Sequence, residues 1–207
     1  MTSTVGVESV SVRDLNWEDR DIAVPLVATG IGEVPLYRWL LGADPGDDVI
    51  HWWADSLFAA HVADGARGLV GDDGTMRGVI LWSPPNRRPT EYPEDLRRTT
   101  AAMITRIPGF TQRYEEMVTA ETAASPAGTS LGIVFAGVER TSRRRGLLGD
   151  LVDPVIAMAD DGGVPVVVQT CDPQLAVTYE RRWRTTPRAH YTVTGGPTVW
   201  ILQRDPP

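Results

Sequence analysis

Two uninterrupted apolar stretches stand out in the second half of the chain. They are residues 131–138 (LGIVFAGV) and 164–170 (VPVVVQT), and both have the length and composition typical of buried strands. Residues 146–160, which lie between them, have the pattern of a helix. A strand, a helix and a second buried strand in succession predict a parallel or mixed sheet with a crossover helix.

The rest of the chain alternates between helical and strand-like patterns. Ile50, Trp53 and Leu57 recur at helical spacing, and Asn16 is suited to be the N-cap of an earlier helix. The segment GDDG (71–74) predicts a hairpin turn. The other expected strands are 5–12, 68–70, 77–82, 189–193 and 198–203. The other expected helices are 17–29, one within 48–65, 94–120 (interrupted at Pro108–Gly109) and one within 172–183. Together these elements predict one α/β domain over residues 1–207.

Charge is distributed unevenly along the chain. Residues 1–75 contain 13 acidic residues and 4 arginines, whereas the remainder contains 14 acidic residues and 16 arginines. An acidic half favours a cationic small molecule through its summed field, and it argues against a nucleic-acid-binding face. All 20 lysine-plus-arginine positions are arginine, so chemistry that needs a lysine, such as a Schiff base, is excluded.

Cysteine content and hydropathy limit the class of protein further. Cys171 is the only cysteine, so the chain can form neither an internal disulfide nor a cysteine-rich zinc site. The N-terminal residues do not have the pattern of a signal peptide, and no apolar run has the length of a membrane span. We therefore expect a cytoplasmic protein without a metal centre and without membrane or nucleic-acid partners.

The segment RRRG (143–146) lies between the buried strand and the helix that follows it. The first turn of a helix has N–H groups without partners and a positive dipole end, so it attracts anions. Gly146 allows the backbone to approach a ligand closely, and the guanidinium groups suit phosphate oxygens. An arginine run alone is more often a solvated surface, and the pattern by itself leaves this alternative open.

Residues 138–148 (VERTSRRRGLL) resemble the acyl-CoA-binding motif of the GCN5-related N-acetyltransferase (GNAT) superfamily, in which a valine, a glutamine or arginine, and a glycine stand where Val138, Arg143 and Gly146 stand here. The downstream order of helix, strand, a tyrosine–glutamate pair and two final strands is also similar. Within the superfamily the chain looks most like the puromycin N-acetyltransferase type. The segments that carry this likeness are GVILWSPP (78–85), Pro154 and GGPTVWILQR (195–204).

The resemblance implies a GNAT fold, with a mixed, mostly antiparallel sheet that is splayed between two central parallel strands and flanked by helices. It implies an acceptor-side half at 1–130 and an acyl-CoA-binding half at 131–207. The implied donor is acetyl-CoA, another acyl-CoA or a phosphopantetheine thioester, whose pyrophosphate rests on the amides of the arginine–glycine turn. The residues expected at the donor are Phe135, Ala136, Gly137, Val138, Arg143, Arg144, Arg145, Gly146, Leu147, Leu148, Gly149, Asp172 and Tyr179.

Several positions depart from the family pattern. Leu148 stands where glycine or alanine is usual, Arg140 replaces a proline, and Asp172 and Leu175 stand where asparagine is common. Residues 182–184 (RWR) replace a Leu-Gly-Phe sequence. These departures favour, as an alternative, a longer acyl-CoA or an acyl group on a carrier protein as the donor. A non-catalytic acyl-CoA-binding module is a further alternative.

The resemblance also implies the chemistry, which is direct acyl transfer to an amine with Tyr179 as the general acid toward the leaving thiolate. A backbone N–H near Val138 would polarise the carbonyl. We expect the acceptor to be a small molecule, such as an antibiotic or a specialised metabolite, and the protein to be a monomer or a homodimer. Core packing explains most tryptophans, yet the residues expected on the acceptor side are Trp39, Trp53, Trp82 and Gln169.

The sequence assigns no general base. A water relay to a low-pKa amine needs no base side chain, and a lone histidine is more often structural than catalytic. The candidates considered are Glu33, His51, Asp55, His61, Gln169 and His190.

Overall fold

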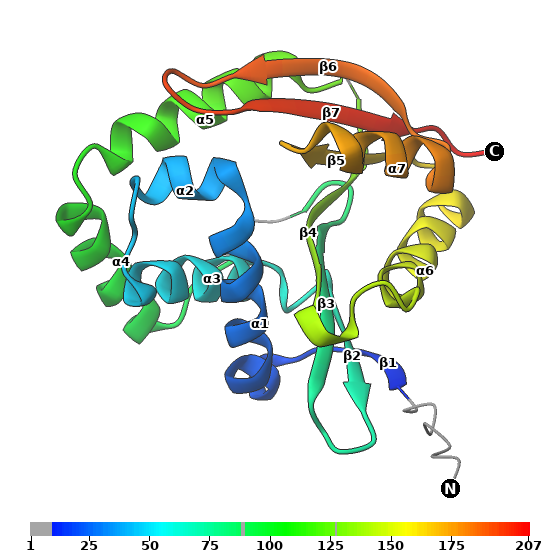
Figure 1. The fold of residues 1–207 in the computed structure, drawn as a ribbon, viewed down its shortest axis with the longest axis horizontal. Coiled ribbons are helices and arrows are strands. Elements are labelled where there is room, and N and C mark those ends of the chain that lie inside the picture. The colour runs from blue at the N-terminus through cyan, green and yellow to red at the C-terminus, as the bar shows by residue number, and fades with distance from the viewer. Residues whose placement is uncertain (1–9, 88–89, 127) are drawn as a thin grey trace, which may run out of the picture.

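A mixed sheet runs through the structure, a computed structural model that describes residues 10–87, 90–126 and 128–207 (Figure 1). Within these residues the sheet has seven strands in the order β1-β2-β3-β4-β5-β7-β6. Every neighbouring pair is antiparallel except β4 and β5. The mixed, mostly antiparallel sheet expected from the resemblance is therefore confirmed. The strands are β1 (Val10–Asp14), β2 (Ala66–Gly71), β3 (Met76–Ser83), β4 (Leu131–Val138), β5 (Val166–Thr170), β6 (Thr186–Thr192) and β7 (Thr198–Arg204).

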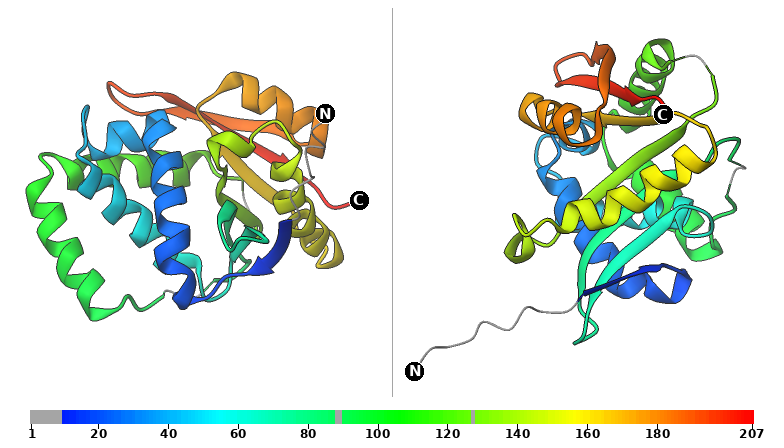
Figure 2. Two further views of the ribbon diagram at one scale, coloured as in Figure 1. Left: turned by 60° about the horizontal axis from the view of Figure 1, so that its bottom comes forward. Right: turned by 90° about the vertical axis from the view of Figure 1, so that its right-hand side faces the viewer.

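Helices cover both faces of this sheet (Figure 2). The helices α1 and α3 pack on one face of the central strands, whereas α6 packs on the other. The helices of the described residues are α1 (Arg20–Glu33), α2 (Pro35–Leu41), α3 (Asp47–His61), α4 (Glu94–Arg106), α5 (Phe110–Ala124), α6 (Leu147–Asp161) and α7 (Pro173–Trp183), with short 3₁₀ turns η1 (Trp17–Asp19) and η2 (Arg140–Ser142). None of them has the length and apolar character needed to cross a membrane.

The alternation of side chains along β3 explains how two cores form around one sheet. Val79 and Leu81 point into the core under α1 and α3, whereas Ile80 and Trp82 point into the core under α6. All four side chains are buried. Burying each one contributes about 1.5–3 kcal/mol to the free energy of unfolding. Because β3 pairs with β4, the two halves of the chain share this sheet.

The central parallel strands are paired over only part of their length. β4 pairs with β5 from Leu131 to Ile133, and the remaining residues of β4 have no partner on that side. β4 also has a bulge where it diverges from β5. Leu81 of β3 pairs with Phe135 and Trp82 pairs with Ile133, so Val134 is an extra residue in β4. In Figure 1, β4 runs down and away from β5. The splayed sheet that the resemblance implies is present.

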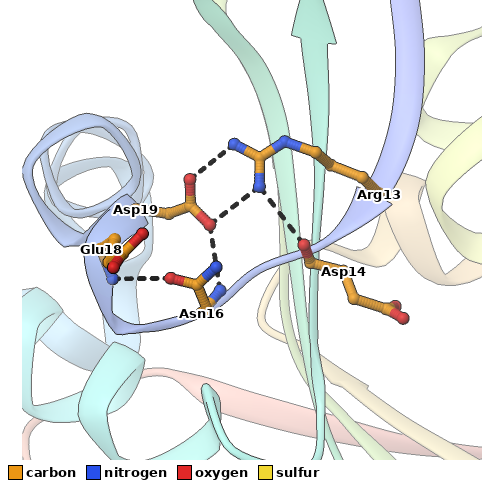
Figure 3. A network of polar contacts seen from close by, with 5 residues as sticks. All are labelled: Arg13, Asp14, Asn16, Glu18 and Asp19. Carbon is orange, nitrogen blue, oxygen red and sulfur yellow. Dashed lines mark hydrogen bonds and ion pairs between the residues drawn. The ribbon is translucent and has the colours of Figure 1, made fainter.

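The start of the first helical segment is fixed by its capping residues (Figure 3). The side chain of Asn16 accepts a hydrogen bond from the Glu18 N–H at 2.7 Å, and Asp19 accepts one from the Asn16 N–H at 3.0 Å. The Arg13 guanidinium bridges back to Asp19 from β1, with Nη1 2.8 Å from Oδ2. This capping box confirms Asn16 as the N-cap and joins β1 to the helix.

The apolar pattern missed one helix and did not define the core face of another, and one predicted strand lies partly outside the described residues. The pattern did not predict α2 as a helix. The residues Ile50, Trp53 and Leu57 of α3 are only half-buried, and the core face of this helix is formed instead by Trp52 and Phe58 together with their neighbours. Positions 5–9 of the predicted strand 5–12 are outside the described residues, which begin at Val10.

Candidate active site

A cleft with a volume of about 1710 Å³ opens where β4 and β5 diverge. One part of its lining comes from β4, the turn before α6 and the helix α7, and another part comes from α2, α3, α4 and α5. Every residue expected at the donor lines this cleft except Arg145, which is exposed elsewhere. The expected donor residues, which come from three separate segments of sequence, are therefore brought together around one space.

The turn before α6 leaves backbone N–H groups available to a ligand. Gly146 is the N-cap, with φ of +88°, and it has no side chain that could cap the first turn. Arg144 also has a positive φ, of 65°. That conformation costs a non-glycine residue about 1 kcal/mol or more and is found most often at functional sites. The turn thus combines a helix N-terminus with open backbone, which suits an anion.

The three arginines of the RRRG segment do not act as one patch. Arg143 donates from Nη2 to Glu33 at 2.7 Å and from Nε to the Val138 carbonyl at 3.0 Å. Arg140 donates to the other oxygen of Glu33 at 2.6 Å. Burial acts to raise the pKa of Glu33, but the two arginines hold it below its ordinary value. Arg144 lines the cleft, and no described residue pairs with its guanidinium. Of the three consecutive arginines, it is the one positioned for an anion in the cleft.

Leu148 and Phe135 occupy the cleft in different ways. Leu148 is half-buried and packs against the core under α6 while it also lines the cleft. The Phe135 ring is buried in the core under α1, so the β4 segment that follows the bulge presents mainly backbone to the cleft. The bulge itself is at Val134, four residues before the position near Val138 where a polarising N–H was expected.

Tyr179 lies on α7 with its ring 5.4 Å from that of Trp183. It is half-buried and lines the cleft, and no described residue forms a hydrogen bond with its hydroxyl. Burial, and to a lesser extent the charge of Asp172, raises its pKa above the ordinary value of 10.0. Asp172 caps α7 by accepting a hydrogen bond from the Gln174 N–H at 2.8 Å. The phenol therefore keeps its proton throughout the neutral pH range.

Two of the four residues expected on the acceptor side line the cleft, namely Trp53 and Gln169. Trp39 does not. Its Nε1 donates to the Thr194 carbonyl in the β6–β7 turn at 3.0 Å. Trp82 is buried in the core under α6, with the Arg67 guanidinium 5.6 Å from its ring. The side chains of Trp39 and Trp82 therefore do not belong to the lining of the cleft.

No protein-family model matches the sequence, and no curated protein matches it. Solved structures do match it along almost the whole chain. The Corynebacterium glutamicum protein described as "histone acetyltransferase HPA2 and related acetyltransferase" has a TM-score of 0.71 at 17% identity, over 96% of this chain and 97% of that one. The Drosophila melanogaster polyamine N-acetyltransferase has a TM-score of 0.66 at 14% identity, over 95% and 100%. Arylalkylamine N-acetyltransferase 2 from Aedes aegypti has a TM-score of 0.61 at 14% identity, over 95% and 99%.

The chain has the fold of the GNAT acetyltransferases. At these identities the likeness establishes the arrangement of elements, and the roles of individual residues have to be argued from the geometry of this chain.

Most candidates for a general base in this GNAT fold are engaged or lie outside the cleft. Asp55 is buried and accepts a hydrogen bond from Arg20 Nε at 2.7 Å, and Glu33 is paired with two arginines. His51 and His190 are exposed and do not line the cleft. The fifth candidate, His61, does line the cleft, but burial lowers its pKa to about 4. An imidazole with so low a pKa is a weak base toward an amine.

The remaining candidate, Gln169, leads to a residue that the sequence did not suggest. Gln169 Nε2 donates to Glu121 Oε1 at 2.5 Å, and its Oε1 accepts from the Tyr191 hydroxyl at 3.1 Å. Glu121 is half-buried on α5, lines the cleft, and has no arginine or histidine partner among the described residues. Its spacing from Phe110, Tyr114 and Met117 on one helical face is the signal that could have indicated it.

Proposed function

We propose that the protein is an N-acyltransferase that moves the acetyl group of acetyl-CoA to the amine of a small molecule, such as an antibiotic or a specialised metabolite, in the manner of the puromycin N-acetyltransferase type. One observation carries this proposal. The unpaired edge of β4 and the uncapped N-terminus of α6 open into the same cleft. That cleft continues to Glu121, a carboxylate with no cationic partner among the described residues. The named substrates of two structural neighbours, a polyamine and arylalkylamines, are amines and agree with it.

The residues present fit an acyl-CoA thioester. The unpaired backbone of β4 beyond Ile133 is suited to extended hydrogen bonding with the amides of a pantetheine arm. The turn at Gly146 supplies N–H groups and the positive end of the helix for a pyrophosphate, with the guanidinium of Arg144 beside it. The N–H groups around the bulge at Val134 are the candidates for polarising the carbonyl.

The thioester supplies an activated acyl group, and the chain supplies orientation and proton transfer. The amine nitrogen forms the new C–N bond as the C–S bond breaks, and the sulfur takes the proton of the Tyr179 hydroxyl. The amine loses one proton, and Glu121 is the cleft carboxylate available to receive it, because Glu33 is paired with arginines and Asp172 caps α7. Holding the two reactants in one cleft supplies much of the acceleration.

The test is a comparison of wild type with Tyr179→Phe. Acetyl-CoA is expected to raise the melting temperature of both proteins by the same amount, whereas kcat for acetyl transfer falls about a hundredfold or more in the variant. Arg181→Ala, an exposed change on the same helix, serves as the control and is expected to leave kcat unchanged. Full turnover by Tyr179→Phe would remove the tyrosine from the mechanism. A protein that neither binds acetyl-CoA nor acetylates any amine would reject the proposal as a whole.

The alternative to acetyl-CoA as the donor is an acyl group bound to a carrier protein. Such a donor would use the β4 edge in the same way, and Leu148 at the turn is the observation that favours it, because a small residue is usual there. Competition between acetyl-CoA and an acyl-loaded carrier protein separates the two. Saturation by micromolar acetyl-CoA counts against the carrier.

A further inference from the structure

Aromatic side chains form one continuous wall of the cleft. The Trp53 ring lies 6.3 Å from Tyr37, 5.9 Å from Phe110 and 6.3 Å from Tyr114, and Phe110 and Tyr114 are stacked at 5.9 Å. All four residues line the cleft, and they come from α2, α3 and α5. Rings arranged in this way present flat apolar faces, which suit a flat apolar ligand.

Several large apolar side chains that line the cleft are exposed to solvent. Tyr114, Val118 and Ile104 are 42%, 39% and 38% exposed, and all three line the cleft. These three large apolar side chains all face one concave surface. Exposed apolar groups that cluster in this way mark a place where an apolar partner is bound.

Glu121 ends the apolar face of α5 on the side of the diverging strands. Phe110, Tyr114, Met117 and Glu121 follow one another at helical spacing and all line the cleft. The partner of Glu121 is Gln169, which is the first residue of β5 beyond the last one paired with β4. The carboxylate is therefore held where the two strands part, at the place where the proposed donor arm would end.

The electrostatic surroundings of Glu121 favour a cationic ligand. Among the described residues its hydrogen-bond partner is the neutral amide of Gln169, whereas Glu33 in the same cleft is paired with two arginines. A partly buried carboxylate without a counter-ion gains most from an ammonium group that forms a charge-assisted hydrogen bond. Burial, and to a lesser extent the charge of Glu121, raises the pKa values of Tyr37 and Tyr191.

We propose that the acceptor is a primary monoamine on a flat aromatic body, with its ammonium group bound by Glu121 and its ring held against Trp53, Phe110 and Tyr114. Glu121 lies seven positions after Tyr114 on α5, so the apolar part of the cleft along this helix extends about 10 Å from the carboxylate. A polyamine fits less well. It needs a second carboxylate, whereas the other polar residues that line the cleft include His61 and Arg87, with Arg87 Nη1 3.0 Å from His61 Nε2.

This inference rests on the proposed function, and its test separates the two. Acetyl transfer is measured with tryptamine, 2-phenylethylamine, n-hexylamine and spermidine at saturating acetyl-CoA. The two aromatic amines are expected to have kcat/KM values at least about tenfold above those of the other two, since each buried ring contributes on the order of one tenfold factor or more. A preference for spermidine over both aromatic amines would overturn the inference while leaving acetyl transfer itself intact.

Two variants test which side chains contact the ammonium group and the ring of the acceptor. Glu121→Gln keeps the bond geometry toward Gln169 and is expected to raise KM for tryptamine about tenfold or more, with the Kd of acetyl-CoA unchanged. Tyr114→Ala, at a position that is 42% exposed, is expected to raise KM for tryptamine but not for n-hexylamine. Glu115→Gln is the matched control, because Glu115 is exposed on the same helix and does not line the cleft. An unchanged tryptamine KM in Glu121→Gln would overturn the assignment.

A binding measurement keeps the inference testable if no turnover is found. Titration of the full-length protein with tryptamine by calorimetry is expected to give binding that Glu121→Gln weakens about tenfold and that Glu115→Gln leaves unchanged. Tryptamine binding without acetyl transfer would reject the proposed function alone. Acetyl transfer to other amines without tryptamine binding would reject the acceptor class alone.

Discussion

The guanidinium group of Arg182 lies directly against Gly149 in the first turn of α6. A Cβ atom built on Gly149 would be 1.7 Å from Arg182 Nη2. The same nitrogen lies 3.2 Å from Asp153 Oδ2, and the guanidinium is 5.4 Å from the centre of the Trp183 ring. The sequence RWR, which departs from the family pattern at 182–184, therefore places a cation beside the turn where an anion is expected. Arg182 also lines the cleft.

Replacing Arg182 tests whether this cation belongs to the donor site. Arg182→Ala is expected to raise the Kd of CoA about tenfold, because one charge-assisted hydrogen bond to a phosphate is lost. Pantetheine, which has no pyrophosphate, is expected to bind both proteins equally, and calorimetric titration measures both ligands. Arg181→Ala is the control from the next position on α7. Equal CoA affinity in Arg182→Ala and wild type would show that Arg182 only packs against the helix.

Tyr179 and Asp172 give a prediction about pH. Burial and the charge of Asp172 raise the pKa of Tyr179, and a general acid acts in its protonated form. The kcat profile is therefore expected to stay flat through neutral pH and to fall only above about pH 10. Asp172→Asn keeps an N-cap side chain on α7 but removes the charge, so this basic limb is expected to move to lower pH. A limb that does not move would show that the limb belongs to another group.

The backbone frame of the site could be predicted from local sequence. The strand predicted at 131–138 has the same bounds in the structure. An uninterrupted apolar run between two loops is typical of a central strand that is buried on both faces, and the loops define where it begins and ends. The helix after Gly146 starts within one residue of its predicted position, since a glycine with positive φ ends the preceding turn. Both features depend on a few neighbouring residues.

Side-chain contacts across the cleft could not be predicted in this way. Glu121 meets Gln169 across 48 residues of sequence, and nothing near either residue indicates the other. The apolar stripe Ile50, Trp53 and Leu57 predicted the helix α3 but not what this face contacts, and Trp53 and Leu57 line the cleft. A stripe that faces an apolar binding site has the same spacing as one that faces a core, so periodicity alone does not distinguish them.

Gly30 and Phe135 give a prediction about stability. A Cβ atom on Gly30 of α1 would be 2.5 Å from Phe135 Cζ, so Gly30→Ala forces the buried ring to move. This change is expected to lower the free energy of unfolding by about 1–2 kcal/mol. Urea denaturation measures the difference. Gly32→Ala on the same helix is the control. Its nearest atom is 3.8 Å away, and the gain in helix propensity is expected to raise stability by up to about 1 kcal/mol. Equal effects at both positions would contradict the close packing of Phe135.

His61 connects the cleft to the pH dependence of folding. It is 4% exposed, with Nδ1 2.8 Å from the Leu57 carbonyl and Nε2 3.0 Å from Arg87 Nη1. Burial, aided by Arg87, lowers its pKa from 6.5 to about 4, although the bond to Leu57 acts in the opposite direction. The folded protein therefore holds His61 neutral between these two pH values, whereas the unfolded chain takes up a proton.

This difference predicts how stability changes with pH. Above pH 6.5 both states are neutral at His61 and the group has no effect on the pH dependence. As pH falls toward 4, proton uptake by the unfolded chain alone lowers the free energy of unfolding by about 1.4 kcal/mol per pH unit, or roughly 3 kcal/mol in all. His61→Asn keeps a donor toward Leu57 but cannot titrate, so its stability should approach or exceed that of wild type at pH 4. Urea denaturation from pH 7 to 4 measures this, with the exposed His51→Asn on the same helix as the control. Curves for wild type and His61→Asn that stay parallel across this range would show that His61 is not held neutral by the fold.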